Sequence, residues 1–166
     1  IAGSSVHEKF GALKDTVILV VRHAEDPADG TGLSADGEAR ARACVDYFKN
    51  FKINGSPMKL DYLFAAADSK KSHRSRLTLE PVSKATGLGI DCRFKDENFQ
   101  ELADEIRSKP HGHAILIAWH HGNIPALLGA LGADPGQVLP KGKWPGNVYG
   151  WLIQLRYEQD GQLIDA

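Results

Sequence analysis

Two pairs of residues, each directly after a short apolar run, are suited to chemistry on an anion: Arg22 with His23, and His120 with His121. A guanidinium matches the oxygens of a phosphate or a carboxylate. An imidazole can act as a nucleophile or carry a proton. The helix expected to start near Asn123 adds backbone N–H groups and a positive dipole end. These residue types favour a phosphoryl group over a neutral substrate.

The two apolar runs are expected to be buried strands. The runs Thr16–Val21 and His113–Trp119 are apolar and too short for free-standing helices. Sheets built from such strands carry their chemistry at the rim formed by the carboxyl ends. We therefore expect both pairs of polar residues at one rim.

The remaining chain alternates strands with helices. This alternation predicts an α/β fold, a three-layer α/β/α sandwich with a mainly parallel central sheet and room for an antiparallel edge strand. A bend or restart is expected at Pro81 because proline lacks an N–H donor. The other expected strands are 60–66, 87–94 and 148–157, and the expected helices are 34–51, 77–86, 99–108 and 124–131.

Composition excludes several classes of protein. The chain has 166 residues, 25% charged and 42% hydrophobic, with a formal net charge of −1, so we expect one globular domain over 1–166 with an N-terminal arm over 1–15. We expect neither a nucleic-acid partner nor a membrane partner, because there is no basic excess and no apolar run of about 20 residues. The first residue, Ile1, is not methionine, which fits a shortened cytoplasmic protein or an exported one after signal removal, and both stay open.

Four short motifs resemble one family when they are taken together. They are Arg22–Glu25 (RHAE), Leu33–Gly37 (LSADG), Arg74–Thr78 (RSRLT) and His121–Asn123 (HGN). Their order resembles that of the histidine phosphatase superfamily, the phosphoglycerate-mutase-like group, over residues 17 to about 131. Each motif alone is weak, and the ordered set is specific.

The resemblance implies a role for each matching residue. His23 would be the nucleophile that accepts the phosphoryl group, with its other ring nitrogen held by an acceptor such as a backbone carbonyl. Arg22, Arg74 and His121 would bind the phosphate oxygens and stabilise the transition state. His121 takes this role because it directly precedes the glycine, and His120 and Asn123 are further candidates for substrate binding. No metal and no cofactor are implied.

The general acid is less well defined by sequence. Family members that cleave ordinary phosphate esters place a carboxylate after the third strand, where this chain has Asp96 and Glu97. Asp96 is the better positional match and Glu97 the alternative, and an acidic surface turn is the competing interpretation. Ala24 replaces a glycine that is common in the family, which is tolerable if the backbone angle allows a side chain. Trp144 lies in a Gly/Pro-rich segment expected to be a surface loop.

The sequence therefore predicts a metal-independent phosphatase that hydrolyses phosphomonoesters or phosphohistidine through a phosphohistidine intermediate. Its partner would be a small phosphorylated substrate or a phosphoprotein, and its oligomeric state is open. The alternatives are a phosphate-binding member of the fold without activity, a mutase, and a metal-dependent hydrolase. The last would use His23, Glu25 and the pair His120–His121 as ligands, but two neighbouring arginines would repel a cation and no HExxH spacing is present.

Overall fold

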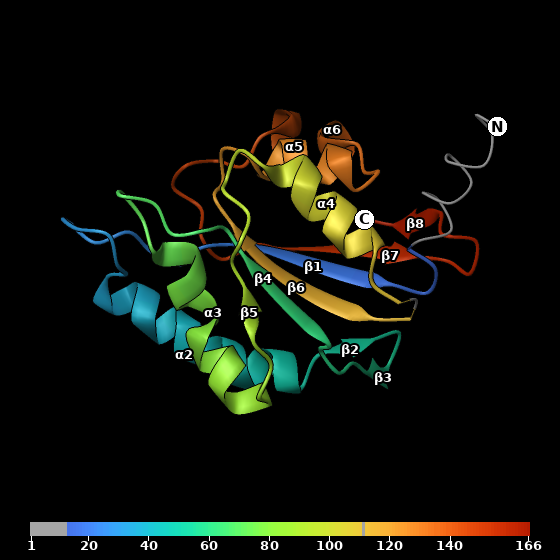
Figure 1. Ribbon diagram of the computed structural model, residues 1–166, viewed down its shortest axis with the longest axis horizontal. Helices are drawn as coiled ribbons and strands as arrows, with labels where there is room; N and C mark the ends of the chain where they lie inside the picture. The colour runs from blue at the N-terminus through green and yellow to red at the C-terminus, as the bar shows by residue number, and fades with distance from the viewer. Residues whose placement is uncertain (1–12, 111) are drawn as a thin grey trace.

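The computed structural model describes residues 13–110 and 112–166, which are built around a six-stranded sheet (Figure 1). The strand order is β5-β4-β6-β1-β7-β8; β5, β4, β6 and β1 run parallel, and β7 and β8 are antiparallel to their neighbours. The strand bounds are β1 Val17–Arg22, β4 Tyr62–Ala65, β5 Ile90–Asp91, β6 Ala114–Trp119, β7 Leu152–Tyr157 and β8 Leu163–Asp165. A separate hairpin consists of β2 (Lys52–Ile53) and β3 (Ser56–Pro57).

Helices cover both faces of the sheet, which confirms the predicted three layers (Figure 1). On one face lie α2 (Ala35–Lys49) and α3 (Arg74–Thr86). On the other lie α4 (Phe99–Arg107), α5 (Ile124–Ala130) and α6 (Pro135–Val138), with a 3-10 turn at Pro140–Gly142 after α6.

The central strands are apolar on both sides because each side meets a layer of helices. Along β6, Leu116 belongs to the hydrophobic cluster that contains Leu79 of α3, and Ile117 to the cluster that contains Leu102 of α4. Every residue of β6 is buried. Burial of this kind is the main stabilising contribution to the fold, and it holds the carboxyl ends of β1 and β6 in a fixed relation.

The start of α2 follows its sequence signal. The Ser34 side chain accepts a hydrogen bond from the Gly37 N–H at 3.0 Å, as an N-cap residue does. Gly37 also packs against the loop after β1, since a Cβ added to it would stand 2.7 Å from the carbonyl oxygen of Glu25. Because the Ser34 N–H also donates to the carbonyl oxygen of Glu25 at 3.0 Å, the serine and the glycine of the LSADG motif hold α2 against that loop.

Helix α3, strand β7 and the residue Trp144 differ from the sequence prediction. Helix α3 begins at Arg74 and continues through Pro81 without a restart, because Leu79 and Val82 on either side of the proline are buried against the sheet. The last expected strand, β7, is antiparallel but not the edge, since β8 pairs with its outer side. Trp144, expected in a surface loop, is 3% exposed and donates from Nε1 to the carbonyl oxygen of Val148 at 2.7 Å.

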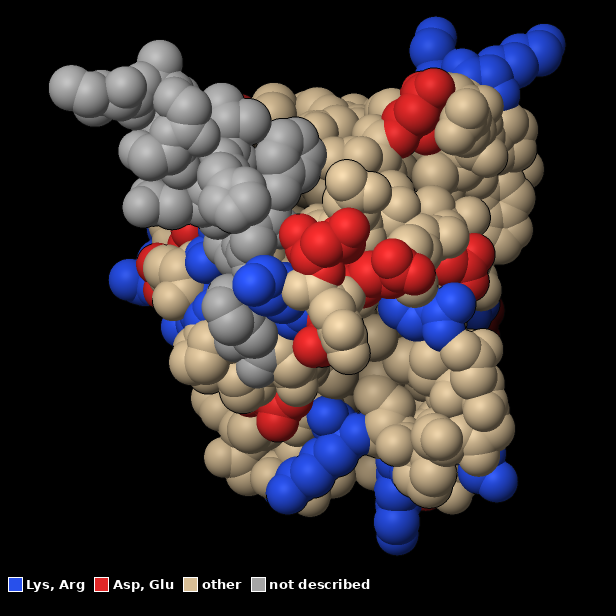
Figure 2. All heavy atoms as spheres, turned by 90° about the vertical axis from the view of Figure 1, so that its right-hand side faces the viewer, with Lys and Arg blue, Asp and Glu red and all other residues tan. Residues whose placement is uncertain are grey.

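The expected N-terminal arm, residues 1–15, lies largely outside the part of the chain that the structure describes. Residues 1–12 of the expected arm lie outside the described residues, while Leu13 is buried in the core. Figure 2 views the face on the right of Figure 1, where acidic and basic side chains are interspersed. Within the described ranges, no helix has the length and apolar character that a membrane crossing would need.

Candidate active site

The site begins where β1 and β6 end. These parallel strands pair in register, with Arg22 opposite Trp119, so the next residues, His23 and His120, emerge side by side. Their imidazole rings meet edge-on with centroids 5.0 Å apart. The expected meeting of polar residues at one rim therefore holds, and it brings His120 directly against His23.

His23 is fixed by backbone contacts on both sides. Its backbone N–H donates to the carbonyl oxygen of Trp119 at 3.0 Å, and its ring Nδ1 lies 2.7 Å from the carbonyl oxygen of Ala24. Because a carbonyl only accepts, Nδ1 carries the hydrogen and Nε2 is left with a free electron pair. This is the backbone carbonyl expected from the sequence.

The same histidine is neutral at physiological pH. His23 is 3% exposed, and burial lowers its pKa to about 4, with the neighbouring His120 and Arg22 acting in the same direction. A neutral imidazole with an unprotonated Nε2 is the form that can attack an electrophile.

Thr78 links the histidine loop to α3. The buried Ala24 donates its N–H to the Thr78 hydroxyl oxygen at 2.8 Å, and that hydroxyl donates to the carbonyl oxygen of Arg74 at 2.7 Å. Ala24 is not among the described residues with a positive φ angle, so the position has no need of glycine. The threonine of the RSRLT motif thus positions the peptide that holds His23.

Arg22 is buried and held by the segment before β7. Its Nη1 donates to the carbonyl oxygens of Gly146 at 2.8 Å and Val148 at 2.9 Å, and its guanidinium stacks on the ring of Tyr149 at 3.9 Å. Burial lowers its pKa from the ordinary value, but a guanidinium in a protein keeps its proton. The result is a fixed cation beside His23.

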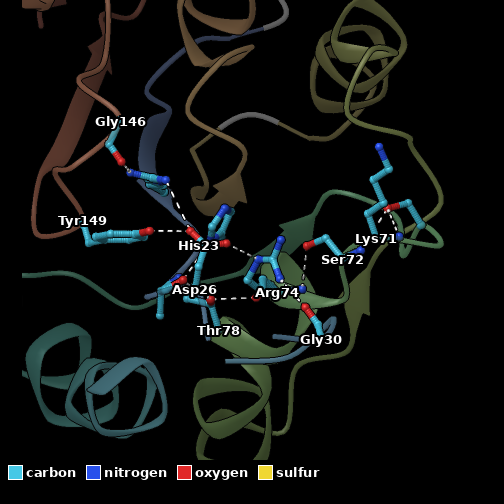
Figure 3. Close-up of polar contacts among 12 residues, drawn as sticks. His23, Asp26, Gly30, Lys71, Ser72, Arg74, Thr78, Gly146 and Tyr149 are labelled. Atoms are coloured by element: carbon cyan, nitrogen blue, oxygen red, sulfur yellow. Dashed lines mark hydrogen bonds and ion pairs between the residues drawn. The ribbon is translucent and has the colours of Figure 1, made fainter. Parts of the chain in front are cut away.

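A carboxylate that belongs to none of the four motifs, that of Asp26, lies between the two arginines (Figure 3). Asp26 approaches Nε of Arg74 to 2.7 Å and Nη2 of Arg22 to 3.6 Å, and it accepts a hydrogen bond from the Tyr149 hydroxyl. Arg74 also donates from Nη1 to the carbonyl oxygen of Gly30 at 3.3 Å. Partial burial raises the pKa of Asp26, but the hydrogen bond from Tyr149 and the charges of the two arginines lower it further, and the net shift is downward. The carboxylate is therefore ionised at neutral pH.

The two arginines, His23 and Asp26 line one cavity of about 830 Å³. It contains all four residues to which the resemblance gives phosphate chemistry: Arg22, His23, Arg74 and His121. Burial lowers the pKa of both His120 and His121, with Arg74 and Arg22 respectively acting in the same direction. The rest of the lining is His120, Gly122, Asp26, Ala67, Asp68, Ser69, Lys70, Lys95, Asp96 and Glu97.

Both candidates for the general acid line this cavity, but they differ in their contacts. Asp96 accepts a hydrogen bond at Oδ2 from the Asn123 amide at 2.9 Å, and its Oδ1 is buried without a hydrogen-bond partner among the described residues. Glu97 is exposed. Asn123, a candidate for substrate binding, is thus occupied by Asp96 and does not line the cavity.

Two residues of the site lay outside the motifs. The hydrogen bond between Tyr149 and Asp26 spans 123 positions in the chain, so no local pattern could reveal it. The only local sign of Asp26 in the sequence was an extra acidic residue directly after the RHAE motif.

Among the residues that the structure describes, no group of three His, Cys, Asp or Glu side chains has the geometry to hold a metal ion.

Solved structures, but no sequence comparisons, show which known proteins share this fold. No family model matches the sequence, and no curated protein matches it. Solved structures that share the fold belong to the histidine phosphatase superfamily, with sequence identities of 12–20% among those compared, so the fold implied by the motifs is confirmed.

Three of these structures illustrate the range. SixA of Agrobacterium tumefaciens, assigned as a phosphohistidine phosphatase, is 20% identical with a TM-score of 0.59, and the match covers 91% of this chain and 97% of that one. Phosphoglycerate mutase of Plasmodium falciparum is 15% identical with a TM-score of 0.60, covering 91% and 88%. A mycobacterial glucosyl-3-phosphoglycerate phosphatase is 15% identical with a TM-score of 0.56, covering 89% and 92%.

Proposed function

We propose that this protein is a metal-independent phosphatase that forms a phosphohistidine intermediate on His23. The observation that carries the proposal is a buried, neutral histidine whose Nε2 is free, beside two arginines in a single cavity. An unprotonated nitrogen supplies the nucleophile, and fixed guanidiniums stabilise the charge on the equatorial oxygens of a transferring phosphoryl group.

The reaction takes place in two displacements. In the first, His23 Nε2 attacks phosphorus, the bond to the ester oxygen breaks, and that oxygen leaves with a proton from the general acid. In the second, water attacks phosphorus and gives a proton to the same acid group, while the P–N bond breaks and its electron pair returns to Nε2. Arg22 and Arg74 bind the phosphoryl oxygens in both steps.

We assign the role of the second histidine to His120 in place of His121. The position before the glycine favoured His121, but His120 follows β6 as His23 follows β1, and their rings are in contact. A group beside the nucleophile can bind an oxygen of the phosphoryl group throughout its transfer. His121 lines the same cavity, but its Nε2 lies beside Gly146, 3.6 Å from where a Cβ of that residue would stand. We therefore assign His121 a weaker contact with the phosphoryl group.

Asp96 is the proposed general acid. Its Oδ2 is fixed by the Asn123 amide, which leaves Oδ1 as the atom that can hold a proton for the leaving group. Glu97 lines the same cavity on an exposed turn and is the alternative. A fixed acid is favoured because proton transfer in the transition state depends on position before it depends on pKa.

The proposed substrates are phosphomonoesters or phosphohistidine. The structures with this fold include proteins named for both kinds of phosphatase as well as mutases. A cavity of about 830 Å³ is large enough for a small phosphorylated molecule.

The decisive experiment traps the intermediate. The protein would be mixed with p-nitrophenyl phosphate in EDTA, quenched in denaturant within milliseconds, and digested for mass spectrometry. We expect phosphate on the peptide that contains His23, and none in His23→Ala, whose folding is checked by circular dichroism. Turnover by His23→Ala at the wild-type rate would overturn the proposal, as would loss of wild-type activity in EDTA.

A further inference from the structure

Asp26 occupies the space between Arg22 and Arg74, where the proposed function puts the oxygens of a phosphoryl group (Figure 3). One carboxylate oxygen lies 2.7 Å from Nε of Arg74 and the other 3.6 Å from Nη2 of Arg22. The Tyr149 hydroxyl, whose ring stacks on Arg22, donates a hydrogen bond to the same carboxylate. The carboxylate therefore contacts the cations that would bind the substrate.

The contacts between this carboxylate and the arginines are ionic, without aligned hydrogen bonds. The buried Nε–H groups of Arg22 and Arg74 have no aligned acceptor among the described residues, even though Asp26 is close to the second of them. The contact between Asp26 and Arg74 is therefore an ion pair, which an anion of higher charge can replace.

The arginines do not depend on Asp26 for their positions. Arg22 is held by the carbonyl oxygens of Gly146 and Val148, and Arg74 donates to the carbonyl oxygen of Gly30. Asp26 itself is 38% exposed, in the loop that follows β1, so it has space to move away from them. Arg22 in particular is oriented by two backbone carbonyls without help from this carboxylate.

Charge makes Asp26 and a phosphoryl dianion competitors. The arginines carry two positive charges and Asp26 cancels one of them, while the lowered pKa values of the surrounding histidines leave these rings neutral. Bringing a dianion to the same donors while the carboxylate stays in place would set like charges in contact, which is strongly unfavourable.

We propose that Asp26 is an internal competitor for the phosphate position, which a phosphoryl dianion displaces and a singly charged anion does not. This inference rests on the proposed function of the same site. A tethered carboxylate has a high effective concentration, so a free monocarboxylate with the same charge gains little by replacing it. A dianion gains contacts to both arginines. Asp26 thereby sets the selectivity of the site for doubly charged phosphoryl groups.

The test is a matched pair of charge-removing variants, Asp26→Asn and Asp68→Asn. Asp68 lines the same cavity and is 37% exposed, but it forms its ion pair with Arg76 and not with Arg22 or Arg74. Binding of inorganic phosphate would be measured by calorimetry at fixed ionic strength and neutral pH. We expect Asp26→Asn to bind phosphate at least about tenfold more tightly than wild type, and Asp68→Asn to stay within about threefold.

Two further measurements distinguish displacement from a purely structural role. Tyr149→Phe keeps the ring on Arg22 and removes the hydroxyl that holds Asp26, so it should tighten phosphate binding by a smaller factor in the same direction. Acetate should compete with phosphate in Asp26→Asn and have no effect on wild type at the same concentration. If Asp26 instead positions the arginines, Asp26→Asn will bind phosphate more weakly and acetate will restore the binding.

The possible outcomes separate this inference from the proposed function. If phosphate appears on His23 in the trapping experiment but Asp26→Asn binds phosphate no more tightly than Asp68→Asn, the competitor role alone is wrong. If neither wild type nor any variant binds phosphate and no phosphate is trapped on His23, the proposed function fails and this inference fails with it.

Discussion

The imidazole of His120 packs edge-on against that of His23, with ring centroids 5.0 Å apart. The contact follows from the pairing of β1 with β6, because the residues directly after two parallel strands in register must emerge together. His121, one position further on, is turned toward Gly146. A single position in the chain therefore decides which histidine contacts His23.

The two histidines should differ in their effect on catalysis. We expect His120→Ala to lower kcat/KM for p-nitrophenyl phosphate by about 10²-fold or more, because it removes a donor beside the transferring phosphoryl group. His121→Ala should cost about tenfold or less. Steady-state kinetics in EDTA measure both, with circular dichroism as the control for folding. A larger loss in His121→Ala would return the role to the histidine that the glycine motif favoured.

The general acid should be revealed by the leaving group. We expect Asp96→Asn to reduce kcat strongly for a phosphate ester of an aliphatic alcohol, whose oxygen must be protonated as it leaves, and only weakly for p-nitrophenyl phosphate. Glu97→Gln is the matched control in the adjacent position and should affect both substrates equally. If neither variant discriminates between the substrates, the acid is another residue; selective loss in Glu97→Gln would exchange the two assignments.

The sequence predicted the parts of the site that local patterns encode. The apolar runs specified β1 and β6 and hence one rim for the polar pairs, and Ser34 marked the start of α2. Choosing between His120 and His121 needed the end of β6 to within one residue, which composition does not define.

The missed features depend on contacts between distant parts of the chain. Tyr149 reaches Asp26 across 123 positions. The buried Trp144 packs at a tilt against Trp151 and donates to a backbone carbonyl. Such contacts are set by the packing of the segment before β7 against the rim. A Gly/Pro-rich sequence carries no sign of that packing.

The depressed pKa of His23 can be measured directly. Nitrogen-15 NMR of the imidazoles should find His23 neutral, with its hydrogen on Nδ1, until the pH falls to about 4, whereas an ordinary histidine takes up its proton near pH 6.5. Because the protonated ring has no free electron pair at Nε2, the acid limit of activity should also lie near pH 4 and not near 6.5. Protonation of His23 between pH 6 and 7 would contradict this.

The same shift links stability to pH. Between about pH 6.5 and 4 the unfolded chain binds a proton at His23 that the folded protein does not, so the free energy of unfolding should fall as the pH is lowered through this window. Across the whole window, His23 alone should lower the free energy of unfolding by roughly 3 kcal/mol. Urea unfolding of wild type and His23→Gln at pH 7 and pH 4.5 measures it, and an equal pH dependence in both proteins would refute it.

Thr78 should stabilise the histidine loop and support catalysis through it. Thr78→Val keeps the shape of the side chain and removes the acceptor for the buried N–H of Ala24, whose carbonyl oxygen orients His23. An unpaired buried N–H costs about 1–3 kcal/mol of unfolding free energy, and we expect kcat/KM to fall about tenfold as the imidazole loses its fixed orientation.

Helix α3 offers a matched control for this substitution. Thr86→Val removes a hydroxyl that donates to the carbonyl oxygen of Val82 at 2.8 Å, the same kind of bond that Thr78 makes to Arg74. This hydroxyl also accepts from the Leu88 N–H at 3.2 Å, but at an exposed position far along the helix from His23, where water can replace it. The substitution should change the unfolding free energy by about 0.5 kcal/mol or less and leave kcat/KM as in wild type. If the two valine variants were equally stable and equally active, the Thr78 hydroxyl would have no special part in holding the peptide at Ala24, and the fixed orientation of His23 would have to come from burial alone.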